Sequence, residues 1–173
     1  MIPSLTTERL HLVPPSLAHL PAEREFFASE RSSFVGGPAP RHKAWRVIAL
    51  HLGHWQILGY GMWAAIERDT GAPVGLVGLW GPEPWPMPEL AYHLYEGAEG
   101  KGFATEAGRT VLDFARDRLG MTELASMIDP ENAASQSVAR RLGAENTGRE
   151  FRADPDGTAV EIWRHDLTKG AYA

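Results

Sequence analysis

A glycine-rich turn near the middle of the chain has the composition of a phosphate-binding loop. It reads Tyr95-Glu-Gly-Ala-Glu-Gly-Lys-Gly-Phe-Ala-Thr-Glu-Ala107 and lies between a predicted strand and the strongest helical pattern in the sequence. Backbone N–H groups at a helix N-terminus bind anions, and glycines let an anion approach the main chain closely. The turn therefore favours a phosphate or pyrophosphate ligand, although a plain strand-to-helix turn would also contain one or two glycines.

Several better-known chemistries are excluded by what the sequence lacks. No Ser or Thr follows Lys101 as an ATP-binding P-loop requires. The dinucleotide fingerprint G-x-G-x-x-G is also absent, because Ala104 and Thr105 follow the second glycine and no early βαβ unit is present. The chain contains no cysteine, which excludes a cysteine nucleophile, a thiolate zinc site and an iron–sulfur cluster. It also lacks a G-x-S-x-G nucleophile elbow, so a covalent acyl-enzyme is not expected.

Other side chains have the types that acid–base chemistry or ligand binding uses. Glu89 begins the strand before the glycine turn. It is either a general base or a solvated carboxylate at the end of a strand. Asn132 and Ser135 begin a later predicted helix, where both residue types also serve as caps. His51 and His54 share a helix face, but no third ligand accompanies them, so we expect no metal site.

The hydrophobic pattern places these residues on a mixture of strands and helices. Strands are predicted at 9–13, 62–66, 74–80, 89–95, 123–128, 147–153 and 158–166. Helices are predicted at 16–30, with a break or kink at Pro21, and at 43–58, 105–119 and 133–142. We expect a mixed α+β fold in a single domain over residues 1–173.

Composition narrows the class of partner. The 22 acidic and 17 basic residues give a net charge of -5, which argues against a nucleic-acid partner. No run of about 18 apolar residues occurs, and Glu8 and Arg9 stand where a signal peptide would be apolar. We therefore expect a cytoplasmic protein without membrane contact.

Four segments, taken together, resemble the GNAT family of N-acetyltransferases, in the branch similar to the ribosomal-protein N-terminal (RimJ/RimL-like) acetyltransferases. They are Leu5-Thr-Thr-Glu-Arg-Leu-His-Leu12; Glu89-Leu-Ala-Tyr92; Gly100-Lys-Gly-Phe-Ala-Thr-Glu-Ala107; and Asp129-Pro-Glu-Asn-Ala-Ala-Ser135, which leads into Val138-Ala-Arg-Arg-Leu-Gly143. The resemblance spans about the full length. It implies a mostly antiparallel sheet of about seven strands, flanked by about four helices and splayed between the fourth and fifth strands, with acetyl-CoA in the split.

The resemblance also implies which residues bind acetyl-CoA. The amides of the glycine turn bind the CoA pyrophosphate, the end of the preceding strand runs beside pantetheine and the acetyl carbonyl, and the later helix start borders the CoA thiol. These residues are Leu94, Tyr95, Glu99, Gly100, Lys101, Gly102, Phe103, Ala104, Thr105 and Asn132. Glu99 departs from the family pattern, because an acid beside a pyrophosphate is unfavourable unless its side chain turns to solvent.

The catalytic roles follow from the same resemblance. Glu89 is expected near the amine acceptor, as a general base acting through water, and Ser135 is expected to hydrogen-bond to the departing sulfur. Many relatives place a tyrosine general acid where this chain has Ala139. An ordinary thiol has a pKa of roughly 8.5, so release of the thiolate at pH 7 costs about 2 kcal/mol without that tyrosine.

The acceptor pocket is expected to be walled by the second helix and by the loop before Glu89, with His54, Trp55 and Trp85 as its candidate residues. The expected reaction is acetyl transfer from acetyl-CoA to a primary amine, by direct attack in a ternary complex. The acceptor is a protein N-terminus or a small-molecule amine, the net charge mildly favours a cationic one, and a homodimer is possible. The alternative is a non-catalytic acyl-CoA-binding or sensing domain, which Ala139 and Glu99 suggest.

Overall fold

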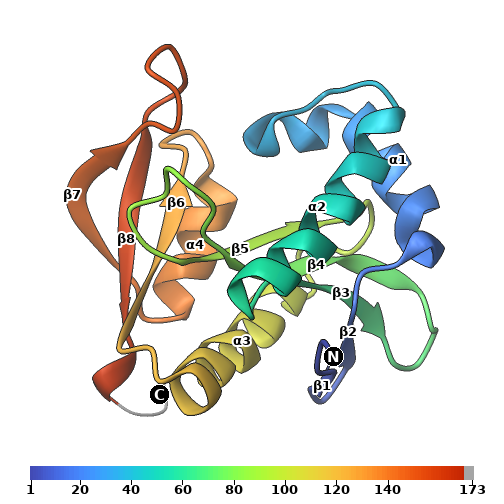
Figure 1. Ribbon diagram of the computed structural model, residues 1–173, viewed down its shortest axis with the longest axis horizontal. Helices are drawn as coiled ribbons and strands as arrows, with labels where there is room; N and C mark the ends of the chain where they lie inside the picture. The colour runs from blue at the N-terminus through green and yellow to red at the C-terminus, as the bar shows by residue number, and fades with distance from the viewer. Residues whose placement is uncertain (170–173) are drawn as a thin grey trace.

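An eight-stranded mixed sheet organises the computed structural model, which describes residues 1–169 (Figure 1). In spatial order the strands are β1 (Leu5–Thr6), β2 (Leu10–Val13), β3 (Met62–Glu67), β4 (Pro73–Trp80), β5 (Glu89–Leu94), β6 (Glu123–Ile128), β8 (Val160–Asp166) and β7 (Glu145–Phe151). The helices are α1 (Leu20–Ala28), α2 (His42–Leu58), α3 (Phe103–Leu119) and α4 (Ala133–Arg141), with the short 3-10 segments η1 (Leu17–His19), η2 (Glu30–Val35) and η3 (Leu167–Lys169).

The sheet splits between β5 and β6. All other neighbouring strands are antiparallel, whereas β5 and β6 are parallel and share a single register pair, Glu89 with Ala125. By contrast, β4 and β5 stay paired from Gly75–Leu94 to Trp80–Glu89. Figure 1 shows β6, β7 and β8 turning away from the β2–β5 half of the sheet. The predicted splay between the fourth and fifth predicted strands is confirmed.

The two faces of the β2–β5 half are covered by different helices. Side chains alternate between the faces of a strand, and the β5 residues follow this rule. Leu90 packs in a core cluster with Leu112 of α3. Ala91 packs in a second cluster with Phe26 of α1, and so does Tyr95, which follows β5 directly. Odd-numbered β5 residues therefore face α1 and α2, and even-numbered ones face α3.

The predicted elements are present with two differences. The segment 16–30 is not one helix: η1 precedes α1, and Pro21 lies in the first turn of α1, where the missing proline N–H costs nothing. The short strand β1, which pairs with β2, was not predicted. No helix within residues 1–169 is long and apolar enough to cross a membrane.

Candidate active site

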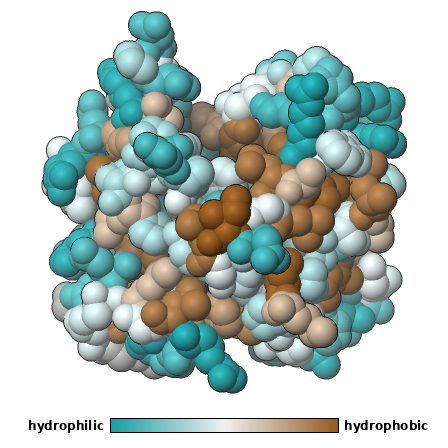
Figure 2. All heavy atoms as spheres, in the orientation of Figure 1, coloured by the Kyte–Doolittle hydropathy of each residue, from teal (hydrophilic) through white to brown (hydrophobic). Residues whose placement is uncertain are grey.

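A cavity of about 490 Å³ opens where β5 and β6 diverge. Its floor includes residues of both strands, and its walls come from α2, η2 and the ends of β7 and β8. Figure 2 shows the surface hollowed between the β7–β8 side and the η2–α1 side, with apolar atoms inside the hollow. Glu89, Tyr92, Asn132 and Ser135 all line it, so the splay brings together residues from three separate segments.

Glu89 is a buried carboxyl group at the edge of this cavity. Its Oε1 accepts a hydrogen bond from Trp85 Nε1 at 2.8 Å, and its Oε2 accepts one from the Met127 N–H at 2.8 Å. Burial raises the pKa of Glu89 to about 7, although both hydrogen bonds favour the charged form. A carboxyl group with this pKa exchanges a proton near neutral pH, as a general base must.

Tyr92 connects β5 to the start of α4 across the splay. Its hydroxyl donates to the Ser135 carbonyl oxygen at 3.2 Å. Burial raises the pKa of Tyr92 to about 12, so the hydroxyl keeps its proton at neutral pH. Asn132 caps α4 by accepting the Ser135 N–H at 3.0 Å. The Ser135 hydroxyl has no hydrogen-bond partner within residues 1–169, so it is free to bind a ligand in the cavity.

A buried polar cluster lies under α1, on the face of β5 that carries Glu89 and is opposite to Tyr92. Glu23 of α1 is fully buried, and its Oε1 lies 2.8 Å from His93 Nε2 and accepts the Tyr95 hydroxyl at 2.7 Å. Burial opposes ionisation of Glu23, but His93 and the hydrogen bonds outweigh it, and the pKa of Glu23 is lowered. His93 lines the cavity, as does His51 of α2. Burial lowers the pKa of His51 to about 4, so this imidazole is neutral at pH 7.

The glycine turn has the conformation that anion binding needs. Gly100 and Gly102 have positive φ angles of 72° and 83°, a region that side chains disfavour, and Gly102 is the N-cap of α3. The Glu106 N–H bonds to the Gly102 carbonyl, but the amides of Phe103–Thr105 bind no acceptor within the described residues. These amides, together with the helix dipole, can bind a negatively charged group.

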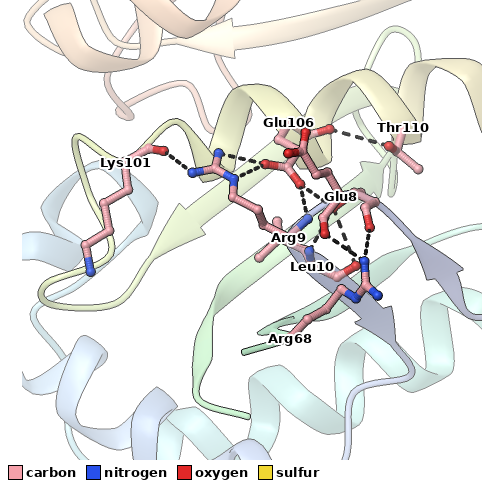
Figure 3. A network of polar contacts seen from close by, with 8 residues as sticks. Glu8, Arg9, Leu10, Arg68, Lys101, Glu106 and Thr110 are labelled. Carbon is pink, nitrogen blue, oxygen red and sulfur yellow. Dashed lines mark hydrogen bonds and ion pairs between the residues drawn. The ribbon is translucent and has the colours of Figure 1, made fainter. Parts of the chain in front are cut away.

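A polar clamp joins the N-terminal strands to this turn (Figure 3). Glu106, in the first turn of α3, accepts the Arg9 N–H at 2.8 Å and the Arg9 Nε at 2.7 Å, and it also accepts the Thr7 hydroxyl. Arg9 Nη1 donates to the Lys101 carbonyl at 2.9 Å. Arg9 therefore fixes the turn both directly and through α3.

The carboxylate of Glu99 forms an ion pair with Arg31 of η2. Both side chains are partly exposed, at 44% for Glu99 and 34% for Arg31. Arg31 therefore balances the negative charge that Glu99 adds to the turn. The sequence alone does not reveal this pairing, because the two residues lie on different elements.

The three predicted acceptor-pocket residues have different positions. Trp85 lines the cavity and holds Glu89. His54 and Trp55 are not among the lining residues. Trp55 Nε1 donates to the Met62 carbonyl at 2.8 Å, and both ring nitrogens of His54 bind backbone atoms. Direct contact of His54 or Trp55 with an acceptor stays a prediction.

Residues 1–169 contain no group of three or more His, Asp or Glu side chains that could hold a metal ion.

The predicted site residues fall into two sets according to their position in the structure. Glu89, Trp85 and Ser135 meet in the cavity, and the glycine turn forms a separate anion site at the N-terminus of α3.

Comparison with known proteins agrees with this architecture. The acetyltransferase (GNAT) domain family matches residues 9–145. The chain belongs to the GNAT acetyltransferases. The family resemblance inferred from the four sequence segments is confirmed, and the family membership supports an acyltransferase enzyme.

Solved structures show the same GNAT fold over nearly the whole chain. The crystal structure of an acetyltransferase from Agrobacterium tumefaciens str. C58 has a TM-score of 0.87 and 37% identity over 95% of each chain. RimL, a ribosomal L7/L12 alpha-N-protein acetyltransferase solved in complex with coenzyme A, has a TM-score of 0.77 and 16% identity. That match covers 95% of this chain and 98% of RimL, and at this identity it shows the fold alone.

Curated relatives match part of this GNAT domain. The uncharacterized protein YkkB of Bacillus subtilis (strain 168) is 34% identical over 89 residues, which cover 49% of this chain and 52% of YkkB. The uncharacterized N-acetyltransferase p20 of Bacillus licheniformis is 28% identical over 87 residues. The match spans about half the length of these relatives.

The residues present fit acetyl-CoA, the acetyl donor of the GNAT family. The free amides of Phe103–Thr105 suit a pyrophosphate, and no atom lies within 4 Å of where a Gly100 Cβ would stand. The Thr105 hydroxyl in the same turn has no hydrogen-bond partner within the described chain. The free Ser135 hydroxyl suits a thioester sulfur, so the two ends of the donor have separate candidate partners.

Proposed function

We propose that this protein is an acetyl-CoA-dependent N-acetyltransferase that acetylates a primary amine in the cavity between β5 and β6. The observation that carries this proposal is Glu89. A buried carboxyl group with a pKa of about 7 lies at the edge of an open cavity, in a GNAT fold whose glycine turn offers free amides. The cavity supplies the base, and the turn supplies the anion site for the donor.

The proton balance of the reaction explains why a base is needed. An ammonium and an acetyl thioester give an amide, a free thiol and one proton, as an N–C bond forms and a C–S bond breaks. Bound acetyl-CoA supplies the activated acetyl group. The acceptor nitrogen loses two protons, of which one ends on the sulfur and the other reaches solvent. Glu89 accepts one of them, directly or through water.

Ser135 is the proposed hydrogen-bond donor to the sulfur. Its hydroxyl is free, and its backbone is held from two sides by Asn132 and Tyr92. A hydrogen bond to a developing thiolate stabilises the charge that forms as the C–S bond breaks. Ala139 leaves no tyrosine at the usual position, so the hydroxyl groups proposed to assist are those of Ser135 on α4 and of Tyr92, which contacts the Ser135 carbonyl.

The cavity walls favour an acceptor amine on an apolar or aromatic body. Apolar side chains supply most of the walls, from Phe27, Val47, Leu50, Trp80 and Phe151. The carboxylates among the lining residues are those of Glu89 and Asp129. A polyamine or an aminoglycoside carries several cationic groups and needs more partners than these two.

A panel of amines tests the proposal. The protein is incubated with acetyl-CoA and 2-phenylethylamine, a tripeptide with a free N-terminus, spermidine or kanamycin, and thiol release is followed. We expect saturable release with 2-phenylethylamine or the tripeptide, and little with the polycations. Thermal stabilisation by CoA without release for any amine would contradict the proposal and favour a sensing domain.

A further inference from the structure

We propose that His93, held by Glu23, is a second proton acceptor of this site and takes the other proton that the acceptor nitrogen loses. The inference rests on the proposed function and extends it. It assigns a catalytic role to a side chain of β5 on the face that α1 and α2 cover, four residues after Glu89. The strand presents both residues to the same cavity.

The contact with Glu23 fixes which ring nitrogen of His93 carries the proton. Glu23 Oε1 lies 2.8 Å from His93 Nε2, and an ionised carboxylate only accepts hydrogen bonds. Nε2 must therefore be the protonated nitrogen, and Nδ1 keeps its lone pair. Nδ1 has no hydrogen-bond partner within the described residues, and His93 is one of the residues that line the cavity. A free lone pair on a side chain that lines the cavity is what a general base needs.

The ring is held rigidly in this orientation. It stacks on Phe26 of α1, with ring centroids 4.3 Å apart and an interplanar angle of 14°. Tyr95 holds the same oxygen of Glu23 at 2.7 Å, which fixes the carboxylate in turn. A carboxylate behind an imidazole both orients the ring and stabilises the imidazolium that forms when the ring accepts a proton.

The charged and titratable neighbours favour this role for His93 over His51. Glu23 of α1, Tyr95 just after β5 and His51 of α2 face His93, and Glu89 lies on the same strand as His93. Glu23 supplies the compensating negative charge. Within residues 1–169, His51 feels the charge of Glu23 but forms no hydrogen bond or ion pair with a carboxylate, and its Nδ1 is buried without a partner. His51 is therefore poorly placed to accept a proton.

The cluster has a feature that a purely structural role does not explain. Glu23 is fully buried, yet its Oε2 has no hydrogen-bond partner within residues 1–169. A buried carboxylate with an unpaired oxygen costs stability that an apolar side chain would not. A buried histidine in this fold does not need a carboxylate, since both ring nitrogens of His54 bind backbone atoms. The role of the buried Glu23 carboxylate is therefore to orient His93 and to balance its charge.

Kinetics test this assignment on the purified protein, with acetyl-CoA and the amine of the panel that reacts fastest. If an ammonium binds and both Glu89 and His93 must be unprotonated, log kcat/KM rises with a slope of two at low pH. His93→Gln should lower kcat/KM by about 10²-fold and reduce this slope to one. Glu23→Gln keeps the shape of the side chain but removes the charge that stabilises the imidazolium, and should also lower kcat/KM.

The matched control is His19→Gln. His19 is a buried histidine whose ring accepts the Ser16 N–H before α1, and it is not among the residues that line the cavity. It should lower Tm while leaving the slope of two unchanged. If His93→Gln or Glu23→Gln lowered the rate equally at all pH values and kept that slope, both residues would be structural and the inference would be wrong.

Histidine NMR on the free wild-type protein gives a readout that needs no activity and no folded variant. We expect a His93 ring with Nε2 protonated and Nδ1 unprotonated at pH 7.5. An Nδ1-protonated ring would overturn the inference. A wild-type protein that acetylates no amine would instead contradict the proposed function.

Discussion

Glu89 Oε2 accepts the backbone N–H of Met127 at 2.8 Å, at the point where β5 and β6 cease to pair. The carboxylate thus satisfies a strand N–H that the splay would leave without a partner. Because the same contact holds Glu89 at the edge of the cavity, the residue that ends the pairing is also the candidate base. Burial at this point raises the pKa of Glu89 to about 7.

Replacing Glu89 by Gln should remove a titrating base without changing its size. Below about pH 7 the wild-type carboxyl group is protonated and cannot accept a proton, because burial has raised its pKa. The ratio of wild-type to variant kcat/KM should therefore grow as the pH rises through 7, to about 10²-fold or more. A complete pH profile for each protein measures this ratio.

The control for Glu89→Gln is the affinity for CoA, measured by calorimetry, which should stay within about twofold of wild type. A variant with wild-type kcat/KM throughout the pH range would show that Glu89 is a structural carboxylate. The proposed chemistry would then lose its base.

Trp85→Phe should shift the acid limb of the same profile. The Trp85 N–H donates to the Glu89 carboxylate and favours its charged form, so loss of this bond raises the pKa of Glu89. We expect the acid limb to move to higher pH by about one pH unit. A shift to lower pH would mean that Trp85 does not stabilise the carboxylate.

Ser135→Ala should lower kcat by about 10-fold at every pH, because a hydrogen bond to a charged sulfur contributes about 1.5 kcal/mol or more. Tyr92→Phe removes only the bond to the Ser135 carbonyl and should cost about threefold. Ser137→Ala is the matched control, since Ser137 is on the same helix but does not line the cavity. Equal effects of Ser135→Ala and Ser137→Ala would argue against a role in sulfur release.

Arg9→Ala should weaken donor binding and change kcat little. Arg9 holds the Lys101 carbonyl and Glu106, so its loss frees the turn whose amides are the proposed pyrophosphate site. We expect a Kd for CoA about 10-fold higher by calorimetry, in line with about 1.4 kcal/mol for contacts to a charged group.

Arg68→Ala is a matched control for Arg9→Ala. Arg68 bonds the carbonyls of Thr7 and Glu8 in the same N-terminal segment, but it has no bond to the glycine turn (Figure 3). Its loss should lower Tm and leave the Kd for CoA unchanged. An increase in Kd of the same size for both variants would show that Arg9 acts only through general stability.

Local patterns in the sequence were sufficient for most elements of the fold. The strand predicted at 123–128 matches the observed bounds of β6, which carries buried residues and pairs with β8 along its whole length. The glycine turn and the helix after it were also predicted, since both depend on neighbouring residues. The break in 16–30 was located at Pro21, but the helix begins there rather than ending there.

The contacts between distant residues could not be predicted in the same way. Glu23 and His93 are 70 residues apart, and Arg9 and Glu106 are 97 residues apart. No spacing in one sequence connects such pairs, because they meet only when α1 packs on β5 or β2 on α3. The sequence held one signal for His93: on the predicted strand 89–95 it lies four residues after Glu89, and therefore on the same face.

The central claim is that an acetyl group passes from acetyl-CoA to a primary amine in the β5–β6 cavity. Isotope-labelled acetyl-CoA, the four-amine panel and mass spectrometry of both products and protein test it most directly. The account predicts labelled acetyl on the amine nitrogen of 2-phenylethylamine or the tripeptide, no label on the denatured protein, and loss of at least 10²-fold in Glu89→Gln above pH 7. Label retained on the protein, or no labelled amine although CoA binds, would contradict it.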